Sequence, residues 1–412
     1  MPLQRLRSGF SATLGRAGAV VSASSVLAAG VAFAVNLLMA RSLGPDSRGD
    51  VALLLSVAYF VTPVTLLGVD RLVLRQGGVG PAHLGGYVLV LNVVAAAGLS
   101  IVLGWSAVVV GAVSLCGAMT VVARARALHS GHVRTFALLF VSQQAGILLT
   151  SVGLFVAGVT DWRLWALGYC LSAPVFAVVE LRSALRRDAL PVGRLALTLL
   201  PGAVAALVVT RVDRVLLGSL GGAYELGLYV TVATATEPVF WISQALADRR
   251  SSTAHDRTGR LAADVAVFTA TSTVLSVALW FAVEPLFGPQ FAPAKAFIVP
   301  LGVAGILLAL YRQGVAALVR SASPRRASVV ELATAAVALP VYVVAVTRWG
   351  AAGAAWGSAV VYLVGLLVSR AAGRGLAPAV PSRPVEGPVL SDPRGTVAAP
   401  ALPVTQPARA EP

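Results

Sequence analysis

A short turn occurs twice in this sequence, as S-L-G-P-D-S-R-G-D at residues 42–50 and as S-L-G-G-A-Y-E-L-G-L-Y at residues 219–229. Each copy follows one long apolar segment and precedes another. Gly49 and Gly227 are 178 positions apart, and an Asp-Arg pair after the next apolar segment repeats at the same spacing. We therefore expect two similar halves in the same orientation, with a site between them near the middle of a membrane.

The composition indicates the same class of protein. Apolar residues make up 57% of the 412 positions and charged residues only 12%, and the mean hydropathy is +0.83. Soluble domains usually have about 25% charged residues. A soluble enzyme and a disordered scaffold are therefore excluded, and a polytopic membrane protein is indicated. We find no P-loop, no catalytic motif and no Cys/His metal spacing, so we predict neither an enzyme nor a bound cofactor or metal.

Twelve segments are long and apolar enough to span a membrane, which takes about 20 residues. We predict an all-α polytopic membrane protein whose spans lie at about 18–40, 51–69, 84–104, 106–122, 135–156, 164–185, 195–217, 224–247, 261–287, 296–319, 327–346 and 351–369.

These spans divide the chain into an N-terminal segment (1–17), a first six-helix half (18–187), a linker (188–194), a second half (195–370) and a disordered Pro-rich tail (371–412). Of the 32 basic residues, 24 fall in alternate connecting segments and the two ends, whereas five fall in the other connections. The positive-inside rule then places both termini in the cytoplasm of a multi-pass protein of the cell membrane. Basic residues scattered in this way do not form a nucleic-acid-binding surface.

The two turns also carry a family resemblance. L-M-A-R-S-L-G-P-D-S-R-G-D-V-A-L-L at residues 38–54 resembles the start of polysaccharide-biosynthesis flippases in the multidrug/oligosaccharidyl-lipid/polysaccharide (MOP) exporter superfamily. D-R-V-L-L-G-S-L-G-G-A-Y-E-L-G-L-Y at residues 213–229 resembles their second-half signature. The resemblance implies a MATE-like transporter fold that moves a polyprenyl-diphosphate-linked oligosaccharide to the outer leaflet by alternating access. Its implied partners are this substrate, membrane lipids and other polysaccharide assembly proteins.

Two other transporter classes remain as alternatives. One is an ion-coupled multidrug antiporter of the same superfamily, although the first span has no carboxylate to bind a cation. The other is a major-facilitator transporter, because G-V-D-R at residues 68–71 and A-D-R-R at residues 247–250 resemble a loop of that family. The second Gly-Arg unit of that loop is missing here.

Charged residues inside the spans are the candidate site, because an ionisable group in a bilayer costs about 2.5–3.5 kcal/mol on insertion scales. Arg211 and Arg214 are three positions apart and share a helix face. Paired guanidinium groups bind phosphate oxygens, so we predict that they and Arg312 bind substrate. Asp213 and Glu237 are the candidate coupling or charge-pair groups.

Glu237 precedes Pro238, and by position along its span it lies at the same depth as Arg312. The two form either a charge pair facing a cavity, with Glu237 carrying a coupling proton, or a structural salt bridge. The repeated Asp-Arg pairs give a further alternative between an inner gate and simple helix-end charges; these residues are Asp70, Arg71, Asp248 and Arg249.

Overall fold

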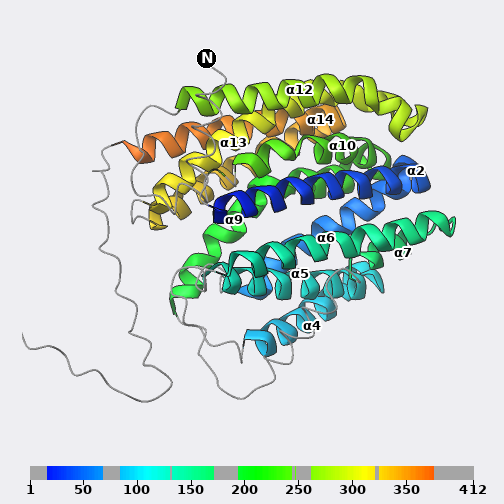
Figure 1. Cartoon of the computed structure of the whole chain (residues 1–412), viewed down its shortest axis with the longest axis horizontal. Coiled ribbons are helices and arrows are strands. Elements are labelled where there is room, and N and C mark those ends of the chain that lie inside the picture. The colour runs from blue at the N-terminus through cyan, green and yellow to red at the C-terminus, as the bar shows by residue number, and fades with distance from the viewer. Residues whose placement is uncertain are drawn as a thin grey trace, which may run out of the picture. The chain divides into compact units, whose positions relative to one another are not determined.

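The computed structural model describes residues 16–67, 84–129, 132–170, 194–243, 246, 261–320 and 324–374 (Figure 1). These residues are nearly all helical and belong to one compact unit. Six helices among them are long and apolar enough to cross a membrane, which confirms the all-α polytopic class. The count of twelve spans stays a prediction, because the predicted spans 164–185 and 224–247 run beyond the described residues.

The first two predicted spans lie in α2 (Arg16–Leu66), which bends at Gly44 (φ 70°, ψ −179°). Glycine adopts this conformation readily, and proline with its fixed φ suits the first position of the helix that follows. The second helical segment therefore begins at Pro45, six residues before the predicted start. This difference determines where Arg48 lies.

The remaining described helices of the first half largely follow the apolar pattern. They are α4 (Leu84–Leu103), α5 (Ser106–His129), α6 (Val133–Val156) and α7 (Trp162–Gly168). α4 and α6 match their predicted spans, whereas α5 continues seven residues past its predicted end. Gly104, with φ of 56°, separates α4 from α5. α2 packs against both α5 and α6.

The second half begins with α9 (Arg194–Leu216), the short π-helix η1 (Leu217–Gly221) and α10 (Ala223–Thr236). It continues with α12 (Leu261–Phe287), the 3₁₀-helix η2 (Pro289–Phe297) and α13 (Ile298–Arg320). The last element, α14 (Pro324–Gly373), contains both final predicted spans and bends at Gly350. The predicted linker and tail lie almost entirely outside the described residues.

The repeated turn has the same backbone form in both copies. Gly222, which is 178 positions after Gly44, has φ of 91° and ψ of 167°, so both glycines combine positive φ with extended ψ. In each copy a new helix begins at the next residue, Pro45 or Ala223. The sequence repeat is therefore a structural repeat at this point.

The two new helices cross each other at glycines, and α10 packs extensively against α2 (Figure 1). A Cβ atom on Gly49 would lie 1.8 Å from the carbonyl oxygen of Ala223. A Cβ atom on Gly227 would lie 1.8 Å from the carbonyl oxygen of Pro45. Since Pro45 and Ala223 are also 178 positions apart, the contact is reciprocal and relates the halves by an approximate two-fold axis. We call this contact the glycine crossing.

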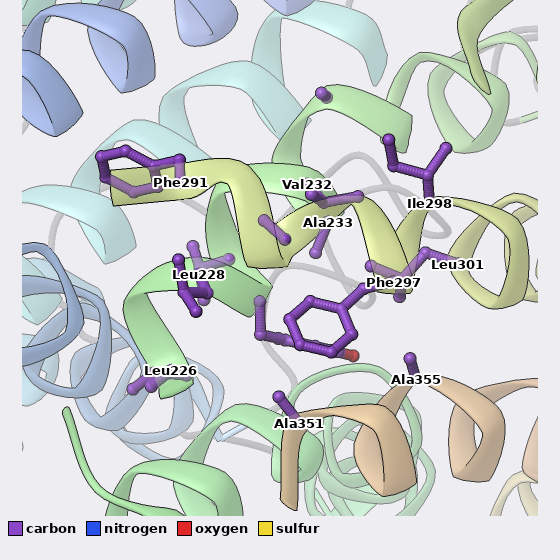
Figure 2. Packing of buried hydrophobic residues seen from close by; sticks show 14 of the residues in the cluster. Leu226, Leu228, Val232, Ala233, Phe291, Phe297, Ile298, Leu301, Ala351 and Ala355 are labelled. Carbon is purple, nitrogen blue, oxygen red and sulfur yellow. The ribbon is translucent and has the colours of Figure 1, made fainter. Parts of the chain in front are cut away.

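Apolar packing holds the second half together around α10. Figure 2 shows Leu228 and Val232 of α10 in one apolar cluster with Phe297 of η2 and Ile298 of α13, with the small Ala351 and Ala355 of α14 on the side of Phe297. The small alanines let α14 approach closely. Glu225 supplies a polar tie, because its Oε2 accepts a hydrogen bond of 2.7 Å from the Ala351 backbone N–H. That bond caps the helical segment that begins after Gly350.

Candidate functional site

A cavity of about 150 Å³ lies among α9, α10, α13 and α14. Its lining includes all five charged residues that the sequence singles out within the spans, namely Arg211, Asp213, Arg214, Glu237 and Arg312. A larger groove of about 690 Å³ follows α14, but every side chain that lines it is apolar. The small polar cavity is therefore where chemistry with a charged ligand is possible.

Two arginines of α9 converge on one carboxylate. The Arg214 Nη2 donates to Glu237 Oε1 at 3.0 Å, and the Arg211 Nη1 reaches the same oxygen at 3.4 Å. The spacing of three residues places both guanidinium groups on the helix face toward α10. The site thus has two cations held by a single carboxylate.

Arg312 does not pair with Glu237, so the predicted charge pair between them is wrong. Arg312 donates to Glu331 Oε1 at 3.1 Å and to the Ala206 carbonyl oxygen at 3.3 Å. The reason is helix packing, since α13 packs mainly on α14 and turns Arg312 toward the α14 residue Glu331. Glu331 is only 3% exposed, and it is not among the site residues predicted from the sequence.

Asp213 belongs to a separate buried network. The Tyr229 hydroxyl donates to Asp213 Oδ2 at 2.5 Å and lies 3.3 Å from Ser358 Oγ. The Tyr342 hydroxyl donates to the same Ser358 oxygen at 3.1 Å. Among the described residues, the buried Asp213 Oδ1 has no hydrogen-bond partner. Asp213 therefore has one oxygen for a proton or a cation, and it is not bonded to the arginines.

Glu237 lies at a break in its helix. α10 ends at Thr236, and helix resumes at Pro238, which has no backbone N–H. The Glu237 backbone N–H donates to Thr234 O at 3.3 Å, and the Thr236 hydroxyl donates to Ala233 O at 2.9 Å. The freed backbone groups are thus satisfied locally, which proline in a membrane helix requires.

Side chains of the first half reach the site from α2 and α6. The Arg211 guanidinium lies over the Tyr59 ring, 5.4 Å from its centroid. Trp241, which lines the cavity, lies 6.0 Å from the Phe140 ring. The cavity residues therefore connect the second half to the first.

Arg48 lies in the stretch 42–50 that the sequence analysis describes as a turn, yet the structure places it in a helix as a buried cation. It is 4% exposed, and its Nε and Nη2 donate to Asn36 Oδ1 at 3.0 and 2.7 Å. Asn36 Nδ2 in turn donates to the Thr231 carbonyl oxygen of the second half at 3.2 Å. The signal that was available is Gly44-Pro45, which predicts a helix start at Pro45 and so places Arg48 in the first turn.

Some predicted site residues are not placed by the structure. The proposed inner-gate residues Asp70, Arg71, Asp248 and Arg249 all lie outside the described residues. Their role stays a prediction.

Comparison with known proteins gives matches to solved structures only. A scan against protein-family models gives no match for this chain. A search of curated proteins gives none either. The chain is similar to a lipid II flippase, MurJ, in an inward closed conformation, with a TM-score of 0.63 and 9% identity over 85% of this chain and 86% of that chain.

Two further structures are similar over most of their length. An outward-facing multidrug resistance MATE family transporter of the MOP superfamily has a TM-score of 0.56 and 13% identity, covering 87% of this chain and 94% of that chain. A MOP superfamily transporter from Pyrococcus furiosus has a TM-score of 0.54 and 14% identity, covering 86% and 95%. The chain therefore has the MATE-like fold of MOP superfamily transporters.

Proposed function

We propose that this chain is a flippase of the cell membrane, with both termini in the cytoplasm. Its cargo is a polyprenyl-diphosphate-linked oligosaccharide, a precursor of cell-surface polysaccharide, which it moves from the cytoplasmic to the outer leaflet. One observation carries the proposal. Of the three arginines that line the cavity among apolar helices, Arg312 is paired with Glu331, whereas Arg211 and Arg214 share the single carboxylate of Glu237. Such an excess of arginine suits a diphosphate, whose oxygens accept paired N–H donors.

The cavity size supports alternating access. Ligand pockets usually measure about 300–1,000 Å³, and this cavity measures about 150 Å³. Every residue that lines the cavity belongs to the second half, although the sequence predicts a site between the halves, and Tyr59 of the first half lies over Arg211. We propose that separation of the halves enlarges the cavity enough to admit a diphosphate and a sugar. The polyprenyl tail stays in the bilayer, so only the polar part of the cargo needs the cavity.

Asp213 is our candidate for coupling transport to an ion gradient. Its Oδ1 is buried and has no hydrogen-bond partner among the described residues. A proton or a monovalent cation at this oxygen would neutralise a carboxylate that is costly to bury alone. Tyr229 and Ser358 connect Asp213 to α10 and α14. Binding of a proton or cation to Asp213 would therefore change the hydrogen bonds of these two helices.

Arg211→Gln is the test of the cargo assignment. We expect flipping of a fluorescent polyprenyl-diphosphate glycan in proteoliposomes to fall by at least about tenfold, the equivalent of about 1.4 kcal/mol of lost interaction. The protein should still reach the membrane in normal amount, because Arg214 continues to pair with Glu237. Dithionite quenching of the outer leaflet measures the rate.

Arg163→Gln is the matched control, since this arginine lies over Trp105 and Trp162 and does not line the cavity. Its flipping rate should equal that of the wild type. Normal flipping by the Arg211→Gln variant would remove the site assignment. Transport of a cationic dye without any flipping would instead identify a multidrug antiporter.

A further inference from the structure

Glu237 occupies the position that an anion bound to Arg211 and Arg214 would need. Its Oε1 accepts from both Arg211 and Arg214. Two cations on one helix face, without a counter-charge, would be costly to bury in an apolar bundle. The carboxylate removes this cost while the site is empty. A phosphate oxygen would compete with Glu237 for the same N–H donors.

Glu237 is also placed where its release has mechanical consequences. It lies between the last α10 residue, Thr236, and Pro238, at a point where the regular helical hydrogen bonds are interrupted. A helix bends most easily where proline removes a ladder bond. The ion pairs to α9 therefore hold the chain in place at its weakest point.

The segment beyond this break makes a contact with the first half. Trp241, four residues after Glu237, packs 6.0 Å from Phe140 of α6. Phe140 is buried and lies under the Arg124 guanidinium, 4.0 Å from its ring centroid. In this contact, Phe140 is held in place by its burial in the first half. The position of Trp241 depends on the conformation of the segment 238–243.

We propose that Glu237 is a displaceable latch: the diphosphate of the cargo takes Arg211 and Arg214 from it, the segment 238–243 moves at Pro238, and the Trp241–Phe140 contact opens. This inference rests on the proposed anionic cargo. In this exchange, the hydrogen bonds from the two arginines to Glu237 are replaced by hydrogen bonds to the diphosphate. Part of the binding energy is therefore used to move the segment, and the cargo is bound weakly enough to be released. Cargo binding and opening of the contact between the halves thereby become one event.

Hydrogen–deuterium exchange read by mass spectrometry on the purified full chain tests the latch. The probe is geranylgeranyl diphosphate, and geranylgeraniol is its uncharged match. Ligands usually slow amide exchange where they bind. The latch predicts the reverse for segment 238–243, where the diphosphate should speed exchange severalfold while the alcohol leaves it unchanged.

Variants of Glu237 separate the latch from simple charge removal. The Glu237→Gln variant should bind the diphosphate about tenfold more tightly, within the usual range of coupling between sites. Its segment 238–243 should exchange fast without ligand and gain nothing on adding it. Glu237→Asp, which keeps the charge on a shorter side chain, should lie between. Glu284→Gln removes the same charge from an exposed carboxylate paired with Lys295 and should match the wild type.

Each outcome decides the matter. Binding of the diphosphate with unchanged or slower exchange at 238–243 would overturn the latch and leave the proposed function standing. No binding of the diphosphate beyond that of the alcohol would overturn both. A Glu237→Gln variant that fails to fold leaves the wild-type and Glu237→Asp measurements, which decide by the same criterion.

Discussion

The buried pair of Arg312 and Glu331 shows that one charged residue can both line the cavity and stabilise the packing of its helices. Arg312 lines the cavity and also bonds to Glu331 Oε1 and the Ala206 carbonyl oxygen. Removing one member of a buried pair leaves the other without its counter-charge. An Arg312 variant would therefore lose the proposed cargo contact and stability together.

The double variant Arg312→Gln/Glu331→Gln separates these sources. Arg312→Gln alone should lower the free energy of unfolding by about 3–5 kcal/mol, because Glu331 is left buried and charged. Adding Glu331→Gln should restore most of that stability but not the flipping rate. Thermal unfolding in detergent and the proteoliposome assay give the two readouts. If the double variant were as unstable as Arg312→Gln, the loss of stability would not come from leaving Glu331 without its partner.

Among the helices, the glycine crossing explains why both copies of the repeat have glycine at the equivalent positions Gly49 and Gly227. The backbones of two helix starts touch there, and each contact point needs a residue without a side chain. Gly44 and Gly222 then set the direction in which the helices leave the turn. Close approach of this kind is how membrane helices gain van der Waals contact without a hydrophobic driving force.

Gly227→Ala should therefore disturb the crossing. Its new methyl group would meet the Pro45 carbonyl oxygen at 1.8 Å, so the backbones must separate. We expect a loss of about 1–3 kcal/mol of stability, the usual cost of overpacking. Gly30→Ala is the control, because a Cβ atom at Gly30 meets nothing within 4 Å. Thermal unfolding of both variants measures the difference, and equal melting temperatures would show that the crossing tolerates a side chain.

The sequence predicts elements well where an apolar run ends in polar residues. α12 has the predicted bounds, and α4 and α6 differ from theirs by two residues at most. The π-helix η1 and the 3₁₀-helix η2 were not predicted, because neither has an apolar period of its own. The helix start at Pro45 was placed too late, because charged residues after it resembled a loop.

Some residues of the candidate site are likewise predictable from the sequence, and others depend on how the helices pack. Spacing along one helix predicts that Arg211 and Arg214 share a face, and the structure brings both to Glu237. Which helix Arg312 faces depends on the packing of α13 against α14, and depth along a span carries no information about this. Gly44-Pro45 predicts the helix start before Arg48, but the burial of Arg48 follows from the crossing of the two halves and has no local sequence signal.

The two halves touch on both sides of the cavity. On one side are the glycine crossing and an edge-to-face contact of Phe33 with Phe287, at a ring distance of 5.9 Å. On the other side is the contact of Phe140 with Trp241. Trp241 follows Gly227 of the crossing by 14 residues of α10 and its continuation. At about 1.5 Å per residue, the two contacts lie about 21 Å apart along this helix. The alternating access that we propose would open only one of these contacts at a time.

Arg41 joins the two halves on the side where the glycine crossing lies. The charge distribution predicts that this side faces the outside of the cell. Its Nε and Nη2 donate to the carbonyl oxygens of Leu286 and Pro285, at 2.5 and 2.8 Å. These carbonyls end α12, so a first-half cation stabilises a second-half helix terminus. A cation at an exposed helix C-terminus contributes up to about 1 kcal/mol.

Arg41→Gln should therefore shift the balance toward the outward-open form by about fivefold, which corresponds to that 1 kcal/mol. The measurement is the rate at which a membrane-impermeant maleimide labels Leu308→Cys, a cavity position, in right-side-out spheroplasts. Cys116 and Cys170 are first replaced by serine so that only the new thiol reacts. Arg163→Gln is the control, since this arginine stacks on tryptophans of its own half, and its labelling rate should not change. A labelling rate that stays the same in the Arg41→Gln variant would show that Arg41 caps α12 without holding the halves together. A rise only from the cytoplasmic side would reverse the orientation assigned from the charges.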